Sequence, residues 1–262
     1  MKTSRLLLSL TLLLLICFVG CASRSTSHSS FSALVFSKTL MFRHASITNG
    51  IAAIKKLGLE NRFHVDATED SSWFTPANLA KYKVVIFLST SGDILNDEQQ
   101  AVFQEFVARG GGLVAVHAGV AGDVATEGGW PWYGEALCAR FTNHSAIVEA
   151  TIDVEDLRNP STAGLPKRWV RKDEWYNFIE SPRGQVRVLA SLDESTYKGG
   201  TMPGDHPIAW CKKMGRGRVW YTGLGHTEAS FTEPLFLQHL LGGIQVAASV
   251  KSADFKPQPT SR

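Results

Sequence analysis

The sequence of 262 residues has little charge, few cysteines and no long apolar run after its first twenty residues. Charged residues make up 19% of the chain, and 27 basic against 24 acidic side chains leave a formal net charge of +3. No block of lysine and arginine is interleaved with aromatic residues, which is the footprint that a nucleic-acid-binding protein requires. We therefore exclude nucleic acid as a partner.

The composition also limits the architecture. Hydrophobic residues make up 44% of the chain, a share typical of a globular protein, so we exclude disordered, collagen-like and coiled-coil chains. The length fits one large domain or two small ones. No internal repeat and no linker is visible between residues 33 and 250, so we predict one domain over this range.

The amino terminus has the pattern of a targeting segment. Lys2 and Arg5 form a short basic head before the leucine-rich stretch Leu6 to Val19, which is too short for a comfortable membrane span. Gly20 and Cys21 follow, as at the cleavage site of a bacterial lipoprotein, in which the cysteine receives the lipid. The pattern predicts that residues 1–21 are a lipoprotein-type signal peptide.

Both ends of the chain are expected to lie outside the folded domain. Residues 22–32 are rich in serine and threonine and are expected to form a flexible tether, and the polar residues 251–262 a disordered tail. The protein is then exported, as a periplasmic or outer-membrane-anchored lipoprotein that meets the membrane only through its lipid. Ordinary signal cleavage, which would give a secreted protein, is the alternative.

Cysteine usage adds little to this picture. Two of the four cysteines, Cys17 and Cys21, lie in the targeting segment, and the chain has no zinc-type pair of cysteines. The other two, Cys138 and Cys211, could form a disulfide in an oxidising compartment or remain two buried thiols. Their spacing does not decide between these alternatives.

Apolar runs alternate with helical patterns in the first half of the domain. Strands are predicted at residues 33–36, 63–67, 83–88 and 113–116, and helices at residues 47–57 and 96–108. This alternation favours a mostly parallel sheet with helices on both faces. We predict a three-layer α/β/α sandwich of the doubly wound, flavodoxin-like kind, with the strand at residues 83–88 in the centre.

The second half of the domain is less regular. Residues 122–143 form an excursion rich in glycine and tryptophan. Strands are predicted at residues 147–154, 186–192, 208–212 and 218–222, and could lie antiparallel at one side of the sheet. A closing helix is predicted at residues 236–246.

Several histidines fall where a doubly wound sheet binds its ligands, beyond the carboxyl ends of the strands. His44 lies in the loop after the first strand. His117 ends the strand at residues 113–116 between small neighbours, as at a sharp turn that presents one side chain. We expect these two imidazoles to approach one another. His144, His206 and His226 also stand beside small or loop-forming residues.

Together with the acidic pair Asp173 and Glu174, these histidines suit two chemistries, and the sequence favours neither. Neutral imidazoles with a carboxylate hold a divalent metal such as zinc. Alternatively, histidine and carboxylate side chains transfer protons at a sugar carbon or hydroxyl, because their pKa values can be tuned to working pH. The candidate metal ligands are His44, His117, His144 and His226.

Two tryptophans lie in the excursion, at Trp130 and Trp132. Exposed indole rings stack on the C–H faces of sugars, so the pair could form a carbohydrate platform. The alternative is that at least one of them packs the excursion onto the sheet.

A series of motifs, in this order along residues 33–247, resembles the ThuA-like, or trehalose-utilisation, family. The motifs are Lys38-Thr39, Phe42-Arg43-His44 with Ser46-Ile47, Gly111-Gly112 before the strand that ends in His117, Phe141 with His144, Asp173-Glu174-Trp175-Tyr176, Pro207-Ile208-Ala209-Trp210, and Gly215-Arg216-Gly217-Arg218-Val219 through Gly225-His226.

The resemblance implies a fold similar to the class I glutamine amidotransferases and a role in the use of trehalose or other glycosides, including oxidised 3-keto sugars. Those amidotransferases carry a nucleophilic cysteine at the turn where this chain has His117. A Cys-dependent glutaminase is therefore excluded, since imidazole does not replace a thiolate nucleophile.

We hypothesise an enzyme that acts on a glycoside or 3-keto-glycoside as a hydrolase, lyase or isomerase. His117 and His44 would act at the centre of the pocket, with Asp173 or Glu174 as a proton-transfer or orienting group. The residues assigned to substrate binding are Arg43, Trp130, Trp132, His144, Tyr176, His206 and His226. The second hypothesis is a non-catalytic carbohydrate-binding lipoprotein, which would not need these side chains to converge on one point.

Overall fold

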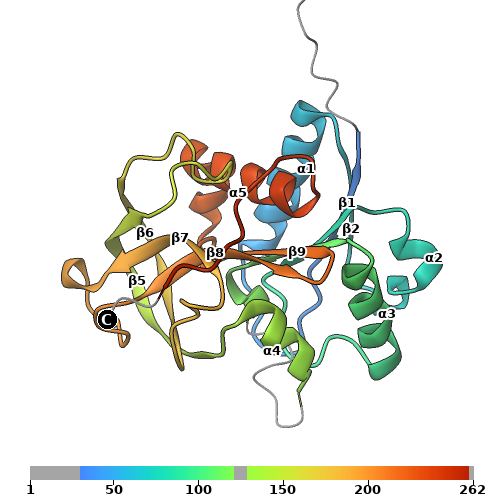
Figure 1. The fold of residues 1–262 in the computed structure, drawn as a ribbon, viewed down its shortest axis with the longest axis horizontal. Coiled ribbons are helices and arrows are strands. Elements are labelled where there is room, and N and C mark those ends of the chain that lie inside the picture. The colour runs from blue at the N-terminus through green and yellow to red at the C-terminus, as the bar shows by residue number, and fades with distance from the viewer. Residues whose placement is uncertain (1–29, 121–128, 260–262) are drawn as a thin grey trace, which may run out of the picture.

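The computed structural model describes residues 30–120 and 129–259 (Figure 1). The predicted signal peptide, Cys21 and most of the tether lie outside the described residues. One sheet of nine strands, in the order β2-β1-β3-β4-β9-β8-β7-β5-β6, forms the centre of the fold. Its strands are β1 Ser32–Phe36, β2 His64–Thr68, β3 Val84–Leu88, β4 Gly112–Val116, β5 Phe141–Val154, β6 Arg168–Phe178, β7 Arg187–Asp193, β8 Pro207–Met214 and β9 Gly217–Thr222.

The first half of the sheet, β2-β1-β3-β4-β9, is parallel throughout. The prediction that residues 83–88 lie in the centre holds for this parallel half, where β3 pairs in parallel with β1 and with β4. In the sheet as a whole the middle strand is β9. All five side chains of β3 are completely buried, because helices cover both faces of a parallel sheet. This is why the strand appears in the sequence as an unbroken apolar run.

The second half of the sheet, β9-β8-β7-β5-β6, is antiparallel. The sheet is therefore mixed, and the prediction of a mostly parallel sheet is corrected. The sequence pattern did not reveal β6 at all, although this strand and β5 form a long hairpin. In β6 the buried side chains include Arg171 and Asp173 on one face and Glu174 on the other, so neither face appears as an apolar pattern.

Helices pack against both faces of the sheet. The helices are α1 Ile47–Asn61, α2 Pro76–Leu79, α3 Asp97–Ala108, α4 Pro131–Leu137 and α5 Pro234–Ala247. In Figure 1, α1 and α5 lie above the sheet, with α3 and α4 below it. The apolar stripe of α1 recurs at Ile47, Ile54 and Leu57, and the start of α3 is fixed by a capping box between Asn96 and Gln99.

The segment after α5 forms no helix or strand in its described part, residues 251–259. The backbone N–H of Gln258 donates to the Val186 oxygen at 3.3 Å, and its side-chain oxygen accepts from the Val188 N–H at 2.8 Å. These contacts attach the segment beside β7, whereas the sequence suggested a disordered tail. Among the described residues, no helix is both long and apolar enough to cross a membrane.

Cys138 and Cys211 are both buried and both free. The disulfide alternative is therefore excluded in this structure. Burial raises the pKa of the Cys211 thiol to about 12, so the group is an inert part of the core at neutral pH.

Candidate functional site

A pocket of about 330 Å³ lies at the carboxyl edge of the parallel strands. The loops after β1, β3, β4 and β9 open at this edge, as they do in doubly wound sheets that bind ligands there. The pocket is lined by Met41, Phe42, His44, Ser91, Ala118, Phe141, His144, Glu174, Tyr176 and His226.

His117 lies at the base of this site, at the turn from β4 into the short helix η2 His117–Val120. Its backbone has a φ of 51°, a left-handed conformation that costs a non-glycine residue about 1–2 kcal/mol. Such strain is found where the surrounding structure fixes a functional side chain. The turn also requires Gly119, because a Cβ there would lie 2.5 Å from the Phe87 oxygen.

The His117 imidazole is completely buried, and its orientation is fixed by a backbone carbonyl. Its Nδ1 lies 2.9 Å from the Gly223 oxygen. A carbonyl oxygen only accepts, so Nδ1 is the donor and carries a proton. The other ring nitrogen, Nε2, therefore presents a lone pair to the pocket side of the ring in the neutral imidazole. Tyr176 packs on the same ring at a centroid distance of 4.2 Å.

His226 enters the site from the loop after β9. Gly225 precedes it with a φ of +107°, which strongly favours glycine. The Nδ1 atom of His226 lies 3.1 Å from Nε2 of His117 and 3.1 Å from Oε2 of Glu174.

Glu174 brings the negative charge from β6. Its Oε2 also lies 3.4 Å from Nε2 of His117, and its Oε1 lies 3.0 Å from Nδ1 of His144. Burial opposes ionisation of Glu174, but hydrogen bonds and favourable charge interactions with His117 and His226 outweigh it and lower its pKa. The carboxylate is therefore ionised at neutral pH and faces three imidazoles.

His44 completes the cluster from the loop after β1. Its ring meets those of His117 and His226 edge to face, at centroid distances of 4.8 and 5.1 Å. The side chain is 5% exposed, and its Nδ1 has no hydrogen-bond partner. Burial, followed by the neighbouring histidines, lowers the pKa of His44 to about 3, so the imidazole is neutral at pH 7.

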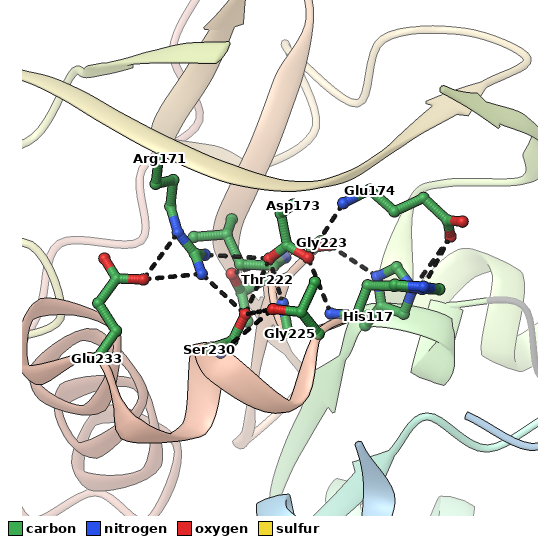
Figure 2. A network of polar contacts seen from close by, with 12 residues as sticks. His117, Arg171, Asp173, Glu174, Thr222, Gly223, Gly225, Ser230 and Glu233 are labelled. Atoms are coloured by element: carbon green, nitrogen blue, oxygen red, sulfur yellow. Dashed lines mark hydrogen bonds and ion pairs between the residues drawn. The ribbon is translucent and has the colours of Figure 1, made fainter. Parts of the chain in front are cut away.

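Asp173 lies beside Glu174 in the sequence but has a different environment, shown in Figure 2. It is completely buried and forms an ion pair with Arg171 at 3.2 Å. Its carboxylate accepts hydrogen bonds from the backbone N–H groups of Gly225, at 2.8 Å, and His226, at 3.1 Å. Asp173 thus holds the loop that presents His226, and the structure places it behind the pocket.

The structure brings together four of the predicted residues most closely. One donor atom from each of His44, His117, Glu174 and His226 lies within 4.8 Å of the corresponding atom of every other. His144, with 48% of its side chain exposed, lies at the pocket mouth on the outer oxygen of Glu174. Tyr176 forms part of the wall.

Two other predicted residues are placed elsewhere. His206 is 1% exposed and is bound by Glu194 at 2.7 Å and by the Tyr176 backbone oxygen at 2.8 Å. It supports the wall from behind and does not line the pocket. The assignment of His206 to substrate binding is therefore corrected. Arg43 forms an exposed ion pair with Glu69 at 2.7 Å and is not itself part of the lining, but it stands between the lining residues Phe42 and His44, so its assignment stays a prediction.

The exposed tryptophan platform is also corrected. Trp130 is 3% exposed and stacks on Tyr133 at 5.2 Å, within the core between α3 and α4. Trp132 stacks on Trp130 and packs against the same core. The rings therefore pack the excursion into the core, against Phe103 of α3, as the alternative interpretation had it in general terms.

The sequence reasoning missed the support behind the loop after β9. Arg171 pairs with Asp173 and with Glu233, and donates to Ser230 at 2.9 Å (Figure 2). Arg171 and Asp173 are two positions apart in β6, so they project from the same face of the strand. That spacing is the sequence signal for this pair, but it becomes visible only once residues 168–178 are recognised as a strand.

Fold and site define an α/β protein with a histidine–carboxylate pocket at the carboxyl edge of its parallel strands. The ThuA family model, described as trehalose utilisation, matches residues 32–247. The chain therefore belongs to the ThuA family, as its motifs indicated. No curated protein matches the sequence.

Solved structures agree with this family. A ThuA-like protein of Bacteroides uniformis is 26% identical, with a TM-score of 0.70, over 82% of this chain and 90% of that one. A ThuA-like protein of Parabacteroides merdae is 22% identical, with a TM-score of 0.69, over 88% and 96% of the two chains. The fold also matches part of a β-galactosidase of Bacillus circulans, at 18% identity and a TM-score of 0.56, over 85% of this chain and 31% of that one.

Proposed function

We propose that this ThuA-family protein is an enzyme that acts on a glycoside or 3-keto-glycoside, with the histidine–carboxylate pocket as its active site. The observation that carries the proposal is the convergence of His44, His117, His226 and Glu174 within 4.8 Å beside the pocket. A purely sugar-binding protein needs aromatic rings and hydrogen-bonding groups, whereas two buried imidazoles and a third, partly buried one gathered around one carboxylate serve chemistry.

The same set of groups favours proton transfer next to a carbonyl. Such a reaction needs one base and one group that polarises the carbonyl oxygen. In a 3-keto-glycoside the carbonyl is at C3, so the base removes the proton from C2. The resulting enolate either expels the aglycone from C1 as an alcohol that takes up a proton, which is a lyase reaction, or is reprotonated to an isomeric keto sugar.

His144 has the position of the base in this scheme. Its imidazole is half-exposed at the pocket mouth, and Nδ1 lies 3.0 Å from Oε1 of Glu174. A carboxylate on one nitrogen orients an imidazole and stabilises its protonated form. His44 and His226 also line the pocket and would face the sugar oxygens, with the buried His117 behind them.

Ordinary glycoside hydrolysis would ask for different groups. It uses two carboxyl groups on either side of the scissile bond, roughly 5–9.5 Å apart. Asp173, the neighbour of Glu174, is buried and bound to Arg171, Gly225 and His226. Lyase or isomerase chemistry therefore fits the site better.

A glutaminase reaction through a thioester is not part of the proposal. His117 occupies the strained turn after β4, where that chemistry needs a nucleophilic cysteine. The three-layer, class I glutamine amidotransferase-like description is proposed for the parallel half of the sheet alone. The helices that pack on both faces of this half support it.

Deuterium exchange tests the proposal directly. The full chain is incubated in D₂O with a panel of disaccharides and their 3-keto derivatives, and the sugars are followed by NMR. We expect deuterium at C2, or release of the aglycone, for at least one 3-keto-glycoside, and a loss of about 10²-fold or more in His144→Ala. Absence of both signals over the whole panel would leave sugar binding without catalysis as the better description.

We further propose a small sugar as the natural partner, and export as a lipoprotein with its lipid at Cys21, held in the periplasm or at the outer membrane. The support for this placement is the basic and apolar pattern of residues 1–21.

A further inference from the structure

The donor atoms of the pocket are arranged as if around one point. We propose that His44, His117, Glu174 and His226 bind a single divalent transition-metal ion of the zinc type. The inference concerns the site of the proposed function, and only its chemical role rests on that proposal. Metal binding itself is measured without any sugar, so the two can fail separately.

The spacing of the donors fits a metal ion. Nε2 of His117, Nδ1 of His226 and Oε2 of Glu174 form a triangle with sides of 3.1, 3.1 and 3.4 Å. Zinc holds imidazole nitrogen and carboxylate oxygen at roughly 2.0–2.2 Å, which places neighbouring donors of a tetrahedral site roughly 3.3 Å apart. The three atoms thus have the separations of three corners of such a site.

The triangle has room for one more positive centre than the neutral imidazoles supply. Nε2 of His117 has only a lone pair when its Nδ1 proton is directed to the Gly223 oxygen. A proton on Nδ1 of His226 can then serve either this nitrogen or Oε2 of Glu174, and the 3.4 Å contact between His117 and Glu174 has no proton of its own. The triangle therefore holds either a further proton or a cation in its centre, and the metal titration below distinguishes the two.

His44 adds a second, independent observation. It is 5% exposed, and its Nδ1 is buried without a hydrogen-bond partner. A buried polar atom without a partner costs roughly 1–3 kcal/mol. A donor atom of His44 lies within 4.8 Å of those of the other three residues, so a small shift of its loop would bring it to a shared ion.

The groups around the donors also have the pattern of a metal site. Ligating imidazoles usually donate their other N–H to a carbonyl or carboxylate, as His117 does to Gly223. Ligating carboxylates usually have a polar partner on their other oxygen, and the outer oxygen of Glu174 lies 3.0 Å from Nδ1 of His144, which also contacts the Ser145 oxygen at 2.8 Å. Asp173 fixes the backbone of His226.

The donor set indicates which ions fit. Three imidazoles and one carboxylate suit zinc, iron, cobalt or copper, whereas magnesium and calcium prefer oxygen ligands. His44, Glu174 and His226 also line the pocket, so an ion among them borders the space that a substrate would occupy. In the proposed reaction it would polarise the carbonyl oxygen of the sugar.

The test uses the untagged full chain, stripped with a chelator and then titrated with zinc, and separately with cobalt. We expect one ion per chain by elemental analysis and visible d–d absorption for the cobalt form. Glu174→Gln, which keeps the size of the side chain, and His226→Ala should each weaken binding by roughly 100-fold or more, beyond the effect typical of outer groups. The matched control is His64→Gln, since His64 is an exposed histidine paired with Asp66, and it should bind as the wild type does.

Circular dichroism of the metal-free variants establishes that they are folded. Fewer than roughly 0.1 ions per chain at saturating zinc would overturn the proposal. The histidines and Glu174 would then be held together by hydrogen bonds and not by a metal ion. Equal binding by wild type, Glu174→Gln and His226→Ala would overturn the ligand assignment. Turnover of a 3-keto-glycoside by metal-free protein would refute the role in catalysis and leave the proposed function standing.

Discussion

Replacing Asp173 by asparagine tests whether the site depends on a buried charge that never touches the pocket. The carboxylate is completely buried and accepts hydrogen bonds from the backbone N–H groups of Glu174, Gly225 and His226. It also pairs with Arg171, whose side chain is 3% exposed. Asparagine keeps the shape but turns one acceptor into a donor that faces Gly225 and Arg171, or else faces Glu174 and His226.

The structure sets the size of the effect. Removing one partner of a buried ion pair costs roughly 3–5 kcal/mol. Arg171 keeps Glu233, at 3.0 Å, and Ser230, at 2.9 Å, so the lower end applies and we expect about 3 kcal/mol. For a domain of this size, 1 kcal/mol shifts the melting temperature by roughly 2–4 °C. Asp173→Asn should therefore melt about 6–12 °C below the wild type.

Thermal unfolding followed by circular dichroism measures this shift. Asp153→Asn is the matched control, since Asp153 pairs with Arg168 on the neighbouring strand with 44% of its side chain exposed. An exposed pair contributes roughly 0.2–1 kcal/mol, so the control should melt within about 4 °C of the wild type. Activity of folded Asp173→Asn should also fall by at least about 10-fold, because the loop carrying His226 is released.

Two results would refute this reasoning. If Asp173→Asn melts within 2 °C of the wild type, the carboxylate does not hold the loop. If it melts lower but retains full activity where it is folded, the position of His226 does not depend on Asp173.

Three further predictions follow from single residues. His117→Ala should stay folded, because the loss falls on a turn at the strand end, and should lose roughly 10²-fold or more in turnover of an authentic substrate; unchanged turnover would remove His117 from the chemistry. Burial lowers the pKa of His239 from 6.5 to about 4. Between these two pH values the unfolded chain binds a proton that the folded chain does not bind. Acidification from pH 7 to 4 therefore lowers the free energy of unfolding by about 3 kcal/mol. His239→Asn can still donate to the Ser161 oxygen and should lose less over this range in urea titrations; an equal pH dependence would contradict the assignment. Cys21→Ser should release the protein from the membrane fraction, and a soluble wild type whose mature terminus is not Cys21 would rule out the lipoprotein.

The parallel half of the fold was predictable because its strands are buried on both faces. β1, β3 and β4 appear in the sequence as short apolar runs, and such runs need no knowledge of their partners. β6 was not predictable in the same way. Its buried residues include Arg171 and Asp173 on one face and Glu174 on the other. Each of these three is held by a group more than 50 residues away: Glu233, Gly225 and His226, respectively. A pattern based on hydrophobicity does not identify a strand whose buried apolar residues are interrupted by buried charges.

The sequence predicted part of the site, just as it predicted part of the sheet. The strand-end rule placed His44 and His117 correctly, because it depends only on which strands are parallel. It could not separate His226, which reaches the pocket, from His206, which is held by Glu194. Both histidines have small or loop-forming neighbours in the sequence, and the difference lies in partners that only the folded chain brings near.

The site needs both halves of the sheet, and this explains its dependence on long-range contacts. The parallel half supplies only imidazoles, from the loops after β1, β4 and β9. The carboxylate comes from β6, at the far end of the strand order, yet Asp173 on this strand hydrogen-bonds the loop after β9. The antiparallel half must therefore curl back over the carboxyl edge of the parallel strands. The imidazoles of His117 and His226 share the one charge of Glu174. Any change that loosens the packing of the antiparallel half onto the parallel half therefore affects these three side chains together.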